Sequence, residues 1–148
     1  MNVLLSSFPG SSMNDKLIFA GANAVAGSVI DCTSYTGTQA IARTISVTRS
    51  LTFVFGNVTL LTNFAAGDIN SHIFWVLADN VRIEGVSRTS NATANGYTRF
   101  VFANQARGYH VFVGNNTASG GTTWNTYNNF SMANIDCQGI QSVITNSG

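Results

Sequence analysis

Carboxylates are the first side chains in this sequence that could do chemistry. The chain has six of them, Asp15, Asp31, Asp68, Asp79, Glu84 and Asp136, and no two are near neighbours in sequence. A glycosidase needs two carboxylates that face one bond. Stacked strands could bring Asp79 or Glu84 near Asp136, so these three are the candidate catalytic residues. The alternative is that Asp31, Asp79 and Asp136 accept hydrogen bonds from backbone amides at turns.

Other reactive residue types occur without the partners that catalysis requires. His72 and His110 stand beside predicted strands, and no serine or cysteine nucleophile motif accompanies either one. The chain has no Asp-rich loop that could supply the about six to eight oxygens of a calcium site. Cys32 and Cys137 have no nearby histidines with which to bind zinc. We therefore predict no metal site and no cofactor.

Aromatic residues interleaved with Asn, Thr and Arg are the stronger candidates for binding. A sugar ring presents an apolar face to an aromatic ring and its hydroxyls to Asn or Arg. Residues 120–129 form a long polar segment with two aromatics, and loops on a rigid scaffold often carry binding. Alternatively, the aromatics of that segment pin their own loop to the structure below. The candidate carbohydrate-binding residues are Trp75, Tyr97, Arg99, Tyr109, Trp124 and Tyr127.

The composition excludes several classes of function. Only 9% of the 148 residues are charged, against about 25% in an ordinary globular domain. The net charge is +1 and the arginines are scattered along the sequence, so we expect no clustered basic face that could bind nucleic acid. No run of about 18 apolar residues could form a transmembrane helix. Solubility must come from Asn, Thr, Ser and Gly, which predicts an extracellular, cell-surface or virion-surface protein without membrane insertion.

Short apolar runs bounded by Asn and Gly predict strands, for example over 51–55, 58–61, 73–77 and 81–86. The unit of strand, Asn/Gly turn, strand and longer loop recurs at irregular intervals near twenty-odd residues, which indicates a solenoid. Asn14 or Asp15 could cap a short preceding helix. The prediction is an all-β, right-handed parallel β-helix, a single-stranded solenoid with a short N-terminal capping helix. The alternative is a β-sandwich or jelly roll.

Three stretches carry a resemblance to a known family. Residues 27–41 read Gly-Ser-Val-Ile-Asp-Cys-Thr-Ser-Tyr-Thr-Gly-Thr-Gln-Ala-Ile. Residues 51–61 read Leu-Thr-Phe-Val-Phe-Gly-Asn-Val-Thr-Leu-Leu, and residues 80–86 read Asn-Val-Arg-Ile-Glu-Gly-Val. This pattern resembles the N-terminal coils of the pectin-lyase-like parallel β-helix superfamily. That resemblance implies polysaccharide lyases, glycoside hydrolases, phage tailspikes or adhesins as relatives. It does not imply one activity, because a fold hosts many functions.

The two cysteines distinguish between the folds. If Cys32 and Cys137 occupy equivalent strands about four coils apart, they lie ~19 Å apart at one strand spacing per coil. A disulfide tolerates at most ~7 Å between Cα atoms. The β-helix therefore predicts two free thiols, whereas a sandwich permits a bridge.

The organisation predicted is a loosely ordered segment over 1–13 and β-helix coils over 14–148. The function predicted is structural or binding, as a module of a surface protein, adhesin or phage spike that contacts polysaccharide and other subunits. We expect a homo-oligomer, or a continuation subunit over the C-terminal edge, because uncovered strand edges attract partners.

We expect no catalysis from this chain alone. One alternative is the N-terminal part of a polysaccharide lyase or glycoside hydrolase whose active coils lie outside this chain. Another is a jelly-roll capsid-type subunit.

Overall fold

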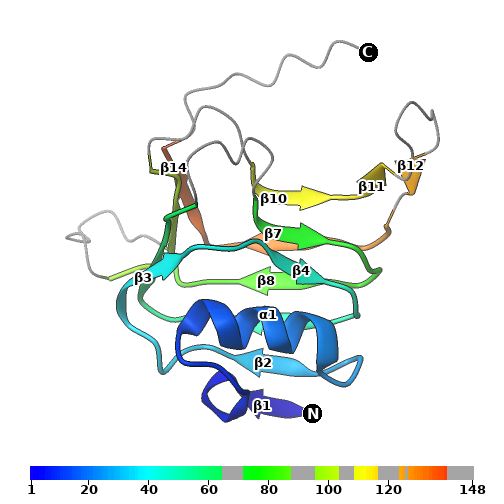
Figure 1. Ribbon diagram of the computed structural model, residues 1–148, viewed down its shortest axis with the longest axis horizontal. Coiled ribbons are helices and arrows are strands. Elements are labelled where there is room, and N and C mark those ends of the chain that lie inside the picture. The colour runs from blue at the N-terminus through cyan, green and yellow to red at the C-terminus, as the bar shows by residue number, and fades with distance from the viewer. Residues whose placement is uncertain (65–71, 88–95, 104–108, 117–123, 126, 140–148) are drawn as a thin grey trace.

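The computed structural model describes residues 1–64, 72–87, 96–103, 109–116, 124–125 and 127–139 (Figure 1). The elements in these residues are β1 (Asn2–Leu4), η1 (Leu5–Ser7), α1 (Met13–Asn23), β2 (Val29–Asp31), β3 (Gly37–Ile41), β4 (Ile45–Val47), β5 (Thr52–Val54), β6 (Val58–Thr62), β7 (His72–Val76), β8 (Arg82–Glu84), β9 (Arg99–Val101), β10 (Tyr109–Val113), β11 (Asn115–Asn116), β12 (Trp124–Asn125), β13 (Ser131–Ala133) and β14 (Asp136–Gln138).

The strands form three parallel sheets and one short antiparallel pair. Sheet A has the order β1-β2-β5-β8-β13, sheet B the order β3-β6-β9-β14, and sheet C the order β4-β7-β10. The chain visits the sheets in turn, so β2, β3 and β4 belong to A, B and C, and the next strands repeat this order. The antiparallel pair is β11 with β12. Each sheet is therefore built from strands that are distant in sequence and stacked in register.

The fold class predicted from the sequence is wrong. The described residues combine three parallel sheets of twelve strands with a helix, which is an α/β-like combination, and the right-handed parallel β-helix is not retained. A jelly roll or sandwich is built from antiparallel strands, whereas every pair within sheets A, B and C is parallel. Local patterns in a sequence indicate strands and their spacing, but not the arrangement of sheets or the share of the core that a helix supplies.

Helix α1 is part of the core and starts at a well-defined cap. The Ser12 hydroxyl accepts a hydrogen bond from the Asp15 amide at 3.1 Å, and the Asp15 carboxylate accepts from the Ser12 amide at 3.2 Å. This reciprocal capping box satisfies amides that the first helical turn leaves unpaired. Ser12 is therefore the N-cap, in place of the predicted Asn14 or Asp15. Leu17 and Ala20 of the helix are fully buried.

Asp15 also ties the start of the helix to the loop before β4. Its carboxylate lies 2.6 Å from a terminal nitrogen of Arg43. Hydrogen bonds from Ser12 and Ser11, followed by the one from Arg43, lower the pKa of Asp15 to about 2. Further along the helix, Gly21 lies against β4, since a Cβ there would meet the Ser46 carbonyl oxygen at 2.5 Å. Only glycine permits this close approach.

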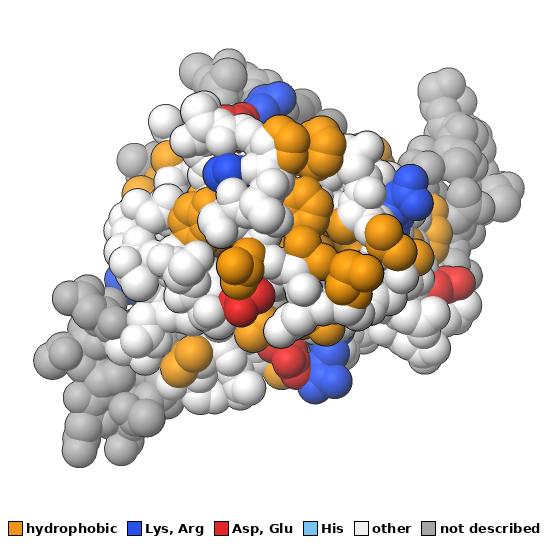
Figure 2. All heavy atoms as spheres, turned by 90° about the horizontal axis from the view of Figure 1, so that it is seen from below, with side chains coloured by type: hydrophobic (Ala, Val, Ile, Leu, Met, Phe, Trp, Pro, Cys, Tyr) orange, Lys and Arg blue, Asp and Glu red, His pale blue; other side chains and the backbone are white. Residues whose placement is uncertain are grey.

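The segment 1–13, predicted to be loosely ordered, contains two regular elements. β1 pairs in parallel with β2, and Leu5 of η1 is fully buried. In the described part of the chain β1 is an edge strand of sheet A. The end face that carries β1 and α1 shows apolar side chains gathered near its centre (Figure 2). Exposed hydrophobic residues of β1, α1 and their flanks are Met1, Leu4, Phe19 and Val25.

The core lies where the three sheets face one another. Phe53 comes from sheet A, Phe74 from sheet C and Phe100 from sheet B, and all three are fully buried. The ring centroid of Phe74 lies 5.5 Å from that of Phe53 and 5.7 Å from that of Phe100. Phe55 meets Phe100 edge-on at 5.7 Å. Such aromatic pairs contribute about 0.5–1.5 kcal/mol beyond their burial, so this cluster joins the sheets.

Asparagine turns connect successive layers. Asn80 and Asn129 both have positive φ, 57° and 58°, a conformation that Asn tolerates better than most residues. The Asn129 side-chain amide donates to the Asn80 side-chain oxygen at 2.9 Å, and the Asn80 amide donates to the Asn128 carbonyl at 2.9 Å. These two turns are thus joined to each other by one side-chain bond and one backbone bond.

The two cysteines are free, as predicted, but they do not occupy equivalent strands. Cys32 follows β2 of sheet A and is buried, whereas Cys137 lies in β14 of sheet B and is exposed. Burial, and to a smaller extent the charge of Asp31, raises the pKa of Cys32. Partial desolvation and the charge of Asp136 raise the pKa of Cys137. Neither thiol is an activated nucleophile, because a nucleophilic cysteine needs a lowered pKa.

None of the helices in the described ranges combines the length and the apolar character needed to cross a bilayer.

Replacing Phe74 with Ala should destabilise the protein by about 3–5 kcal/mol, because it leaves a cavity at the meeting point of the sheets. Urea unfolding measures this loss. Phe19→Ala is the matched control, since Phe19 is 40% exposed, and it should cost less than about 1 kcal/mol. If both variants lose the same free energy of unfolding, Phe74 is not at the centre of the core.

Thiol labelling tests the placement of the cysteines. A thiol reagent should modify Cys137 in the native protein and Cys32 only after unfolding, so that unfolded, non-reduced protein shows two thiols. Because the thiolate is the reactive form and the pKa of Cys137 is raised, its native labelling at pH 8 should be slower than that of a free cysteine and should speed up as the pH rises. Native labelling of Cys32 would refute this placement.

Candidate functional site

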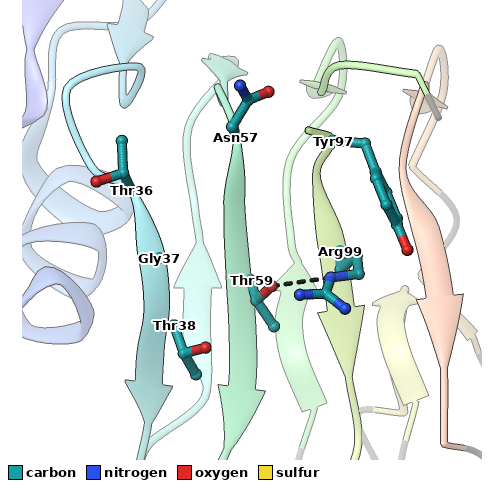
Figure 3. A pocket seen from close by; sticks show the side chains of 7 residues that line it. All are labelled: Thr36, Gly37, Thr38, Asn57, Thr59, Tyr97 and Arg99. Carbon is teal, nitrogen blue, oxygen red and sulfur yellow. Dashed lines mark hydrogen bonds between the residues drawn. The ribbon is translucent and has the colours of Figure 1, made fainter. Parts of the chain in front are cut away.

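A groove on the outer face of sheet B is the candidate site (Figure 3). Its volume is about 380 Å³. We call it the sheet B groove; it is lined by Thr36, Gly37, Thr38, Asn57, Thr59, Tyr97 and Arg99. These residues belong to β3, β6, β9 and the residues just before each strand.

Parallel register places the lining residues in two rows across three strands. Thr38 of β3 is the Cα partner of Thr59 of β6, and Thr59 is the partner of Arg99 of β9. Thr36, Asn57 and Tyr97 lie two positions earlier, just before the starts of these strands, and form the second row (Figure 3). Side chains two residues apart point to the same face of a strand. Three segments that are distant in sequence, residues 36–38, 57–59 and 97–99, therefore lie side by side on one surface.

Arg99 is held in a defined position within this groove. Its Nε donates to the Thr59 hydroxyl at 3.0 Å, and its guanidinium carbon lies 5.3 Å from the centre of the Tyr97 ring. That distance is within the range of a cation–π interaction. Tyr97 is only 5% exposed, so its ring acts as a support for the guanidinium. The Arg99 side chain is thus held in place, and these two contacts leave its terminal nitrogens for a ligand.

The other polar groups of the groove are available to a ligand. Thr36, Thr38 and Asn57 are exposed, whereas Thr59 is buried and bound to Arg99. Hydroxyl and amide groups both donate and accept hydrogen bonds. Gly37 adds no side chain between the two threonines, and the space where its Cβ would stand is open. The groove can therefore form several hydrogen bonds to a polyhydroxylated molecule around one cation.

Two of the predicted binding aromatics, Trp75 and Tyr109, lie outside the groove on sheet C. They belong to β7 and β10 and form a half-buried aromatic cluster with His72 and Phe112. The rings of His72 and Phe112 stack at 4.9 Å. The Trp75 indole nitrogen donates to the Gly114 carbonyl at 2.7 Å. These side chains stabilise the outer face of sheet C, and the structure does not bring them together with Tyr97 and Arg99.

The remaining predicted aromatics are Trp124 and Tyr127. Trp124 lies in β12, where its Cα partner is Asn116 in the antiparallel pair, and its side chain is outside the described part. Tyr127 is half-buried. Neither belongs to the lining of the sheet B groove.

The three candidate catalytic carboxylates lie at three different places. Asp79 is in a turn, where its carboxylate accepts from the Asn128 amide at 2.6 Å. Glu84 is on the outer face of sheet A and forms an ion pair with Arg82. Asp136 is on the outer face of sheet B, where the Gln138 side-chain amide donates to it at 2.6 Å. The predicted approach of Asp79 or Glu84 to Asp136 does not give a shared site.

The alternative expected for the acids, bonds to backbone amides at turns, holds for two of them. The Asp31 carboxylate accepts from the Thr33 amide at 2.9 Å and from the Thr33 hydroxyl at 2.6 Å. These bonds lower the pKa of Asp31. Asp79 accepts from the Asn128 amide. Asp136 differs, because the bond it accepts comes from a side chain, and it lines a second hollow of about 360 Å³ with Ser87, Asn134 and Ile135.

The histidines lie in packing positions. His110 is buried, and its Nε2 lies 2.9 Å from the Gln138 carbonyl oxygen. Its ring meets Phe102 edge-on at 5.4 Å. Loss of hydration on burial lowers the pKa of His110, against the opposing effect of its backbone hydrogen bonds. His72 belongs to the aromatic cluster on sheet C. Neither histidine lines the sheet B groove.

Sequence reasoning found Tyr97 and Arg99 but missed the polar part of the groove. The missed residues are Thr36, Gly37, Thr38, Asn57 and Thr59. Thr36 and Thr38 stand two apart, as do Asn57 and Thr59, which is the spacing of residues on one face of a strand. That signal indicates two polar outward positions on each strand. It does not say that the two strands are neighbours, which depends on pairing between distant segments.

Comparison of the chain with models of known protein families, with curated proteins and with solved structures finds no match. The resemblance to the pectin-lyase-like superfamily stays a prediction from the sequence.

Asp79→Ala should lower the free energy of unfolding by about 1 kcal/mol, because the exposed Asn128 amide loses its charged acceptor. Urea unfolding is the measurement. Glu84→Ala is the control, since an exposed ion pair such as that with Arg82 is worth about 0–1 kcal/mol, and it should change stability less. If removal of Asp79 leaves unfolding unchanged, its structural role in the turn is refuted.

Proposed function

We propose that this chain is a carbohydrate-binding protein that contacts its ligand through the sheet B groove. One observation carries the proposal. Two rows of side chains present threonine hydroxyls, an asparagine amide and an arginine supported by a tyrosine ring. They line one groove, whose volume is about 380 Å³. Saccharides have many hydroxyls, each of which both donates and accepts, so they suit a surface with closely spaced groups of the same kind.

The rigidity of the groove supports a binding role. Thr38, Thr59 and Arg99 stand on paired strands, and sites on strands hold their geometry better than sites on loops. Arg99 is fixed from two sides, by Thr59 and by the ring of Tyr97. A prearranged side chain loses less conformational freedom when the ligand binds, which favours affinity.

A binding role is favoured over hydrolysis by the engagement of the carboxylates. Two-carboxylate catalysis needs a pair of acids at one bond. Asp79 is bound to a backbone amide, Glu84 to Arg82 and Asp136 to Gln138. None of the three lines the groove. The polysaccharide-degrading enzyme therefore has no specific observation in its favour here.

We further propose an extracellular or virion-surface location and self-association as the setting of this function. The low charge, 9% of residues, supports a surface that meets polar polymers through hydrogen bonds. The exposed apolar residues at the end face, Leu4 at 57% and Val25 at 67%, support a contact with another subunit, since exposed apolar patches often mark interaction sites.

Replacing both Thr36 and Thr38 with Val should weaken saccharide binding. Each lost hydrogen bond is worth about 0.5–1.5 kcal/mol, so the double variant should bind about 5- to 140-fold more weakly. The ligand is first found on an array of oligosaccharides, and its affinity is then measured by titration calorimetry.

Thr52→Val is the matched control for this change. Thr52 is half-buried on the outer face of sheet A, away from the groove, so its loss should leave binding unchanged. An array on which no saccharide binds the wild-type protein would overturn the proposed function. Equal weakening by the sheet A and sheet B variants would move the site out of the groove.

A further inference from the structure

Arg99 is a fixed cation without a carboxylate partner among the described residues. The ion pairs there are Arg43 with Asp15 and Arg82 with Glu84. Asp136 is the Cα partner of Arg99 in sheet B, yet its carboxylate is bound by the Gln138 amide at 2.6 Å and forms no ion pair with Arg99. Asp136, the acid that faces Arg99 on the neighbouring strand, therefore does not form an ion pair with the Arg99 guanidinium.

The other acids of the chain are engaged elsewhere. Asp31 binds the Thr33 amide and hydroxyl, and Asp79 binds the Asn128 amide. Asp68 is the one acidic side chain outside the described part. Five of the six acidic side chains thus have partners other than Arg99, and the experiment below tests the sixth directly.

The geometry leaves one edge of the guanidinium for a ligand. Thr59 takes the Nε donor and the Tyr97 ring supports the group. Figure 3 draws no bond from the two terminal nitrogens to any other side chain of the groove. A pair of terminal nitrogens matches the two oxygens of a carboxylate or sulfate in a bidentate contact. Lysine could not reproduce this contact, because its ammonium is a point charge.

We infer that the ligand of the sheet B groove is an anionic saccharide whose acidic group binds the terminal nitrogens of Arg99 while its hydroxyls bind Thr36, Thr38 and Asn57. This inference rests on the proposed function and narrows its ligand class. The acidic group is an oxyanion on a sugar, either the carboxylate of a uronate or a sulfate ester.

The test uses the full chain and matched sets of oligosaccharides, namely a uronate-containing oligomer, its carboxyl-reduced neutral counterpart and a sulfated oligomer of the same backbone. Titration is carried out at about 0.15 M salt, where charges farther apart than about 8 Å are largely screened. An acidic member should bind about 10- to 100-fold more tightly than the neutral one, since a charge-assisted hydrogen bond is worth about 1.5–3 kcal/mol. Preference for the uronate or for the sulfated oligomer identifies the oxyanion.

Variants assign the preference to Arg99. Arg99→Gln should remove the discrimination between acidic and neutral oligomers while neutral binding persists, and Arg99→Lys should retain only part of it. Arg82→Gln is the matched control on the outer face of sheet A and should keep the discrimination. Thermal unfolding of each variant checks that it is folded.

Each outcome decides between the proposals. Neutral and acidic oligomers that bind equally well would overturn the anionic ligand but leave the carbohydrate-binding function standing. Binding of none of them would overturn both. Asp68→Asn that raises the affinity for acidic oligomers about tenfold or more would show that Asp68 competes for Arg99, and the inference of an unpaired cation would be wrong.

Discussion

The inward aromatic cluster is the interaction on which the rest of the structure depends. Phe53, Phe74 and Phe100 come from three different sheets, and their rings meet at 5.5–5.7 Å. Short strands of three to five residues make few hydrogen bonds each, so no sheet would be stable by itself. Burial of these rings makes the three sheets one unit. Helix α1 closes the N-terminal side of the same core with Leu17 and Ala20.

The groove follows from this arrangement because inward and outward positions alternate along each strand. In sheet B, burial of Leu60 and Phe100 in the core turns Thr59 and Arg99 outward. Parallel register then aligns the outward residues of β3, β6 and β9. Packing therefore decides the composition of the groove as much as any local preference does, and a one-residue slip in register would separate Thr59 from Arg99.

The residues predicted to bind sugars lie on more than one surface: Tyr97 and Arg99 line the sheet B groove, whereas Trp75 and Tyr109 lie on sheet C. Tyr97 and Arg99 were expected to bind sugars, and they do lie in the groove, but Tyr97 supports Arg99 and is itself buried. Trp75 and Tyr109 were chosen by the same criterion as Tyr97, yet they pack against other aromatic rings on sheet C. Aromatic residues among Asn and Thr look alike in sequence whether they face a ligand or each other, because the difference depends on which distant strand covers them.

The sequence by itself determined the short strands and the asparagine turns between them, because these depend on local backbone preferences and on residue types within a few positions. The sequence also predicted the helix that precedes β2, but not its N-cap, which is Ser12. The sheet arrangement, the place of the helix in the core and the meeting of Thr36, Asn57 and Arg99 were decided only by the tertiary structure. These features rest on contacts between residues about 20 to 60 positions apart, and no local pattern encodes which distant strands become neighbours.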